Sequence, residues 1–197
     1  MAENAYIHNM AYIPTQPPIS LEFAEMSKKE LKVYFEWFLK VIPGRIAHLR
    51  SAVNESSGLD NWSADFSPDS LLQLGNWFAS EVETRPRTQD EMNAFQLNGH
   101  RIDVERHELT GRTASLAADV GMYLSQVFIQ NFTCLQWSQP LGAKKSVDCG
   151  QPVLVGFGIV PFNPTRMLLG LAYGIASHEE GGGSLRELYD IWSRKIP

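Results

Sequence analysis

The chain has 197 residues, of which 44% are hydrophobic and 20% are charged, a balance typical of a globular protein rather than a disordered or fibrous one. Its formal net charge is −5. No apolar run reaches the ~18 residues of a membrane span, and the first twenty residues lack the basic and apolar segments of a secretory signal. These features predict a cytoplasmic protein that does not enter a membrane, and they leave its oligomeric state open.

The first elements alternate irregular chain with helix. Residues 1–20 carry three prolines and no periodic apolar spacing, so we expect an irregular N-terminal arm. Ser27–Glu30 reads as a capping box that opens a helix. Pro43-Gly44 is expected to break this helix, with a second helical stretch over residues 45–53.

The middle of the chain predicts three more helices. Ser67-Pro68, a cap followed by proline, opens one that runs to about Glu83. A second capping box, Thr88–Glu91, opens a short helix that Gly99 ends. Residues 100–111 fit either a helix or an extended segment. A continuous apolar stripe then predicts a long helix from about Thr113 to Asn131.

The pattern changes in the last third. Short apolar segments separated by Pro and Gly predict a small antiparallel sheet, with strands in residues 133–137, 144–148 and 152–157. Asn163-Pro164 opens another helix, Gly181–Gly183 reads as a flexible hinge or turn, and Ser184–Glu187 reads as a third capping box. We therefore predict an α+β fold, a mostly helical single domain over residues 21–197 with the sheet in its C-terminal half.

Motifs for metal, cofactor or nucleophilic chemistry are missing from the sequence. The five histidines include no pair at the spacing that puts two ligands on one helix face, so no metal site is predicted. Gly156-Phe157-Gly158 lacks the third glycine of a dinucleotide loop, and we expect no cofactor. Cys134 and Cys149 are expected to be free, buried and inert thiols, and no catalytic residue is assigned.

Asp119 lies within the apolar stripe of the long predicted helix. A carboxyl group at that depth must find hydrogen-bond donors or take up a proton, and Tyr123, one turn later, could donate to it. Two readings stay open: a candidate polar site at Asp119 and Tyr123, or a structural hydrogen bond from a neighbouring loop. Gly121, between them, favours a tight contact between this helix and the sheet.

The acidic residues are concentrated in the first half of the chain. Residues 1–100 hold 8 basic and 13 acidic residues, whereas residues 101–197 hold nine of each. Between residues 51 and 84 there are six acids and no Lys or Arg. This distribution argues against binding to nucleic acid, which depends on basic residues, and favours a basic protein partner.

Two aromatic residues lie in a predicted loop within this acidic stretch. Large aromatics among acids have the composition of an interface hot spot. We therefore predict a partner-binding surface formed by Asp60, Trp62, Asp65, Phe66 and Asp69. A solvated acidic face is the alternative for the same residues.

Several different short patterns of apolar residues between residues 27 and 194 resemble those of other proteins. They are Tyr34-x-x-Trp37-Phe38, Ile42-Pro43-x-Arg45-Ile46-x-x-Leu49, Ser115-Leu116-x-x-Asp119-Val120-Gly121-Met122-Tyr123-Leu124, Leu135-x-Trp137, Pro152-Val153-Leu154 and Leu185-x-x-Leu188-Tyr189-x-x-Trp192. They resemble a set of uncharacterised bacterial proteins that are similar to immunity proteins of polymorphic toxin systems, which are small, often acidic and bind their toxin directly. Many of those relatives carry Gly-Glu where this chain has Ser125-Gln126, which removes the one acid that the pattern offers for catalysis. The resemblance transfers no functional residue.

These observations predict a protein-binding domain rather than an enzyme, and the resemblance implies an immunity-type inhibitor of a basic toxin. The alternative is a small hydrolase-like or ligand-binding domain, with a pocket near Asp119 and Tyr123 that also includes a histidine. A homo-oligomeric scaffold is a third reading.

Overall fold

A computed structural model describes residues 12–19, 22–56, 62–97, 106–142 and 146–197 of the chain. Over these residues the fold is mostly helical α+β, as predicted, with the small antiparallel sheet in the C-terminal half. The helices are α1 (Lys28–Glu55), α2 (Ser70–Glu81), α3 (Gln89–Leu97), α4 (Gly111–Asn131), α5 (Pro164–Ala176) and α6 (Ser184–Ser193). The strands are β1 (Thr84–Pro86), β2 (His107–Leu109), β3 (Gln136–Ser138) and β4 (Val153–Val155). No helix of these ranges is long and apolar enough to cross a membrane.

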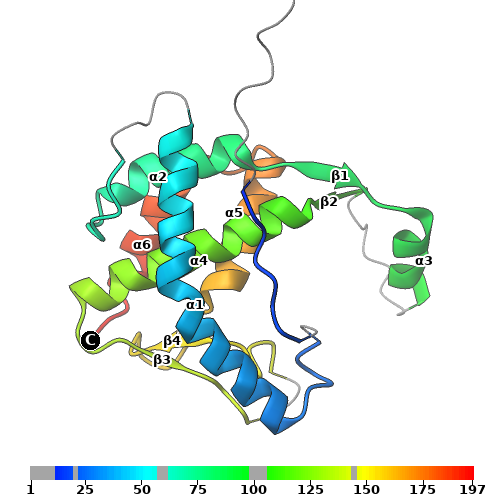
Figure 1. The fold of residues 1–197 in the computed structure, drawn as a ribbon, viewed down its shortest axis with the longest axis horizontal. Helices are drawn as coiled ribbons and strands as arrows, with labels where there is room; N and C mark the ends of the chain where they lie inside the picture. The colour runs from blue at the N-terminus through cyan, green and yellow to red at the C-terminus, as the bar shows by residue number, and fades with distance from the viewer. Residues whose placement is uncertain (1–11, 20–21, 57–61, 98–105, 143–145) are drawn as a thin grey trace, which may run out of the picture.

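Helix α4 is the centre of the core. It contacts α1, α2, α5 and α6, and Figure 1 shows α1 crossing it. Its buried side chains lie on all sides of the helix, as expected for a helix enclosed by neighbours. Gly121 makes a close contact, because a Cβ there would lie 3.1 Å from the backbone of Pro164. The predicted tight contact therefore exists, but its partner is the first turn of α5 and not the sheet.

The predicted break at Pro43-Gly44 is wrong, because α1 continues through both residues. The buried residues Phe38, Ile42, Ile46 and Leu49 form one stripe on both sides of the proline. Burial of this stripe offsets the roughly 3 kcal/mol that an interior proline costs a helix. Pro43 itself faces solvent, where water can satisfy the carbonyl group that lacks its donor.

Two of the three predicted capping boxes form. At α1 the Ser27 side chain accepts from Glu30 N, and the Glu30 carboxylate accepts from Ser27 N. Thr88 and Glu91 make the same pair of bonds at α3. The prediction for Ser184–Glu187 is wrong, because Ser184 is already the first residue of α6 and donates to the Glu180 carboxylate instead. Ser67 accepts from Ser70 N in a turn that precedes α2.

The two small sheets differ in how well they were predicted. Strands β3 and β4 pair antiparallel, with Trp137 opposite Leu154, and Leu154 also pairs with Phe162. The strand expected over residues 144–148 does not form in its described part, where residues 146–150 make turns. Strands β1 and β2 form a second, unpredicted pair, which extends from the helical core toward α3 (Figure 1). Residues 107–109 of the ambiguous segment are thus extended, and residues 98–105 lie outside the described ranges.

Candidate functional site

Trp62 belongs to the core and not to a partner-binding surface. Its side chain is 3% exposed, and its indole N–H donates to the Ser70 carbonyl at 3.0 Å. Its ring lies 5.3 Å from that of Tyr123. The prediction that Trp62 anchors a partner is therefore wrong, because the loop folds inward and buries its aromatic side chains on α4.

Phe66 is held by the same tyrosine. Its ring stacks on Tyr123 with centroids 5.3 Å apart, and its backbone N–H donates to the Tyr123 hydroxyl at 3.1 Å. The residue has a φ of 59°, an unusual conformation for a phenylalanine, which these contacts stabilise. Phe66 is half-buried and forms part of the loop's attachment to α4, so it is not available as the free anchor that we predicted.

The acidic stretch finds its basic partners in later helices. Asp69 pairs with Arg186 of α6 at 2.6 Å, and Glu81 pairs with Arg112 of α4. Asp65 is exposed, and its carboxylate accepts from Ser67 N at 2.8 Å. Hydrogen bonds from the side chain and the backbone of Ser67 lower the pKa of the Asp65 carboxyl group. Asp60 lies outside the described residues. The carboxylates are thus partly neutralised, which weakens the negative field expected from the sequence.

The second candidate site, at Asp119, is a buried structural cluster. Asp119 is fully buried, and Arg45 of α1 donates to both of its carboxylate oxygens, at 2.9 and 2.6 Å. Tyr12 donates to the same carboxylate and hydrogen-bonds Ser115, and burial followed by the nearby Asp119 charge raises the pKa of its phenol. The bidentate ion pair and the tyrosine join the N-terminal segment, α1 and α4.

Tyr123 does not donate to Asp119, which corrects the predicted pairing of these two residues. Its hydroxyl lies 2.7 Å from the Ser70 hydroxyl and accepts from Phe66 N, and burial raises its pKa. Asp119 and Tyr123 thus attach two different segments to α4. Neither residue lines the groove between α5 and α6.

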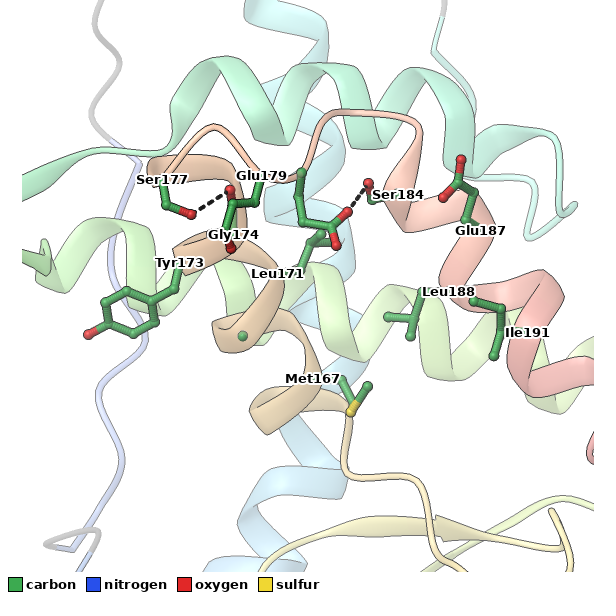
Figure 2. Close-up of a pocket in the computed structure, with 12 residues that line it drawn as sticks. Met167, Leu171, Tyr173, Gly174, Ser177, Glu179, Ser184, Glu187, Leu188 and Ile191 are labelled. Carbon is green, nitrogen blue, oxygen red and sulfur yellow. Dashed lines mark hydrogen bonds between the residues drawn. The ribbon is translucent and has the colours of Figure 1, made fainter. Parts of the chain in front are cut away.

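A groove with a volume of about 500 Å³ lies between α5 and α6. Its apolar residues come from both helices: Met167, Leu171, Leu188 and Ile191. Figure 2 shows Leu171 of α5 and Leu188 of α6 facing the space between the helices. Ile191 is 52% exposed, and the other three are half-buried. These apolar groups therefore stay accessible to a ligand or partner.

Three carboxylates surround the end of the groove where α5 turns into α6. They belong to Glu179, Glu180 and Glu187, and all three residues are exposed. Within the described ranges none of them has a salt-bridge partner. Glu180 packs closely over Gly174 and accepts from Ser184, which holds it at the edge of the groove. We call Glu179, Glu180 and Glu187 the acidic end.

The turn between α5 and α6, which carries Glu179 and Glu180, packs closely against α2. A Cβ on Gly182 would lie 2.2 Å from the Asn76 side-chain oxygen, so the turn packs against α2 and is not the flexible hinge that was one of two readings. His178 has a φ of 62°, and the next two backbone N–H groups donate to the Gly174 carbonyl. These contacts position the backbone of Glu179 and Glu180 relative to the groove.

Sequence reasoning missed this groove, although it contained a signal. Helix α5 is apolar around most of its circumference, with only Pro164, Leu168 and Ala172 fully buried. A helix that is more apolar than its buried face requires either lies deep in a core or leaves apolar surface exposed. The sequence analysis assigned no site to Glu179 and Glu180, which follow α5 closely.

Other chemistry finds little support among the described residues. No group of three or more His, Cys, Asp or Glu residues in these ranges could hold a metal ion. Cys134 and Cys149 are free, but Cys134 is exposed, because it lies in a turn and not in the predicted strand. No protein-family model, curated protein or solved structure matches the chain. A functional assignment must therefore come from the geometry of the site.

Proposed function

We propose that the protein is a protein-binding module, and that the groove between α5 and α6 receives a basic segment of a partner that also carries aliphatic side chains. The observation that supports this function is an accessible apolar floor, formed by Met167, Leu171, Leu188 and Ile191, with three exposed carboxylates at one end. It retains the basic partner predicted from the sequence and moves the binding surface from the acidic loop to the C-terminal helices.

The apolar floor supplies the affinity. A leucine-sized side chain that becomes fully buried contributes roughly 1.5–3 kcal/mol, and the groove is large enough for more than one such group. Leu188 and Leu171 already lie in place, so little ordering is needed upon binding. An aliphatic side chain of the partner would therefore be the main anchor.

The acidic end orients the bound partner and raises the rate at which it associates. Lys and Arg side chains of a partner would meet carboxylates that form no salt bridge with another described residue, and the overall charge of −5 attracts the same partners at longer range. Charges at the edge of an interface mainly change the association rate and its salt dependence, whereas buried apolar contacts mainly change dissociation.

An immunity-type inhibitor of a basic toxin is the specific biological role we propose for this module. Support comes from the sequence resemblance and from the acidic, accessible groove. An immunity gene is expected directly downstream of a large toxin gene, so the position of the gene tests this role independently of the binding measurement.

The binding test uses a fluorescent helical peptide of Leu, Lys and Arg, in which Leu recurs every three or four residues. We expect measurable binding in a polarisation titration, and about tenfold weaker binding for Ile191→Asp and for Glu187→Lys, which corresponds to about 1.4 kcal/mol. A peptide in which Glu replaces every Lys and Arg should not bind. Asp65→Lys is the matched control, because it reverses an exposed charge on the loop first predicted as the binding surface. Equal loss for Asp65→Lys and Glu187→Lys would place the site elsewhere.

A further inference from the structure

A second apolar feature precedes α5, one of the two helices that line the groove. Ile159 is 101% exposed and Val160 is 59% exposed, at the tip of the loop between β4 and α5. We call these two residues the aliphatic tip. An exposed isoleucine next to an exposed valine forms a small aliphatic surface, which gains free energy if a partner buries it.

The loop holds the aliphatic tip in a defined position. Phe157, the residue two before Ile159, is buried and packs edge-on against Trp192 and Phe128. On either side of the loop, Leu154 and Phe162 exchange two backbone hydrogen bonds of 2.8 and 2.9 Å. Because the loop is anchored at both ends, burial of Ile159 against a partner would cost little conformational entropy.

Basic residues flank the aliphatic tip. A Cβ on Gly158 would lie 3.8 Å from the Lys195 carbonyl, so the loop lies against the end of α6. Arg194 and Lys195 follow that helix and are exposed. Neither has a salt bridge to another described residue. We call Arg194 and Lys195 the basic end.

The acidic and basic ends lie at opposite ends of the same pair of helices. Figure 2 shows Glu179 at the turn between α5 and α6, with Met167 and Ile191 farther along the two helices, away from this turn. The loop with the aliphatic tip leads directly into α5, and the basic end directly follows α6. The surface therefore runs from acidic, through apolar, to aliphatic and basic.

We propose that a second copy of this chain occupies the groove when the basic partner is absent, in a two-fold symmetric dimer. This inference rests on the proposed function of the groove. A two-fold axis across the middle of the two helices reverses the surface, so each basic end meets the other copy's acidic end. Each aliphatic tip then lies at the acidic end of the other copy's groove, so this chain supplies the basic and aliphatic segment that the groove selects.

The same charges argue against an anionic membrane as the partner. Arg194, Lys195 and the aliphatic tip alone would suit such a membrane. The acidic end on the same surface would be repelled by it, whereas in a dimer both ends are matched. A second copy therefore accounts for all the exposed features of this surface.

Sedimentation equilibrium of the full chain tests the dimer. We expect a monomer–dimer equilibrium in the micromolar range that weakens as salt rises from 50 to 500 mM, and about 100-fold weaker association for Ile159→Asp. Val33→Asp is the matched control, because Val33 is an exposed aliphatic residue on α1 that should not change association. Circular dichroism should be unchanged for both variants, and so should thermal melting at concentrations at which the wild type is monomeric.

Charge-reversed chains provide a stricter test. Arg194→Glu/Lys195→Glu and Glu179→Lys/Glu187→Lys should each stay monomeric alone, because both contacts in either homodimer pair like charges. Mixed together they should dimerise, because both contacts in the heterodimer pair opposite charges. This recovery is not expected from nonspecific association.

Three results would overturn the inference: a wild-type chain that stays monomeric at 200 µM, a dimer that Ile159→Asp leaves intact, or a monomer that binds phosphatidylserine vesicles through Ile159. Loss of the dimer with retained binding of the Leu/Lys/Arg peptide would reject the second copy and keep the proposed function. The groove would be rejected as a binding site by a different combination of results. In that case the peptide does not bind, and the dimer still depends on Ile159 but is not weakened by Ile191→Asp.

Discussion

At the residue scale, Asp119 illustrates how the core accommodates a charge. It is fully buried, and its two carboxylate oxygens receive donors from Arg45 and Tyr12. A buried charge is tolerated only when its partners replace the water that it loses. The partners come from α1 and from the N-terminal segment, far from Asp119 in sequence, so the sequence alone raised the question without identifying the donors.

Removal of the charge on Asp119 should be costly. We expect Asp119→Asn to lower the free energy of unfolding by about 3 kcal/mol, since it leaves the Arg45 guanidinium, whose side chain is only 14% exposed, without its counter-charge. Asp190→Asn is the matched control and should cost less than about 1 kcal/mol, because its pair with Arg186 is exposed. Urea unfolding of both variants measures the difference, and equal losses would contradict a structural role for the Asp119 cluster. Peptide binding should survive in Asp119→Asn.

Glu91 provides a prediction for pH. Hydrogen bonds from Arg85, and then from Thr88, lower its pKa from 4.5 to about 2. Because the folded-state pKa is the lower one, the stabilisation is fully present above pH 4.5 and is lost as the pH falls toward 2. Carboxyl NMR should place the titration midpoint of Glu91 at about pH 2, and Arg85→Ala should raise this midpoint. A wild-type midpoint near the ordinary value of 4.5 would show that the bonds at the start of α3 do not form.

At the element scale, local signals were reliable where all the interacting groups are close in sequence. The capping boxes at Ser27 and Thr88 form because the serine or threonine and its glutamate are three residues apart. Pro43 did not end α1, because the packing of the buried stripe on α4 outweighs a local penalty. The box at Ser184 failed for a similar reason: the turn before α6 is held by α2, and Glu180 captures the serine hydroxyl.

The contact between α2 and the turn before α6 yields a packing prediction. A Cβ on Gly75 would lie 2.1 Å from the Gly182 carbonyl oxygen and 3.0 Å from Leu185 Cβ. Gly75→Ala should therefore lower the free energy of unfolding by about 1–3 kcal/mol, even though alanine is the better helix former.

Gly44→Ala is the matched control for Gly75→Ala. Gly44 is an exposed helical glycine with no other atom within 4 Å of its Cβ position, so alanine there should stabilise the protein by about 0.5–1 kcal/mol. Thermal or urea unfolding of both variants measures the contrast. If Gly75→Ala is as stable as the wild type, α2 does not pack on this turn as described.

At the scale of the whole molecule, folding redistributes the charge. The acidic stretch is free of basic residues only along the sequence, since Arg186 and Arg112 reach Asp69 and Glu81 from α6 and α4. Glu179, Glu180 and Glu187, which have no salt bridge to another described residue, lie around the turn between α5 and α6, beside an apolar groove. A negative surface therefore exists on this protein, but its position depends on which carboxylates meet a base after folding.

The sequence by itself determined the fold class and the positions of most helices. Apolar periodicity and caps are local properties, and a helix such as α4 can be recognised from its own residues. The tertiary structure decided which side chains are exposed. Trp62 was expected at the surface, yet it is buried against Tyr123, whereas Ile191 in the groove is 52% exposed. Exposure depends on which element covers another, and that depends on contacts between residues distant in sequence, which a pattern within one segment does not contain.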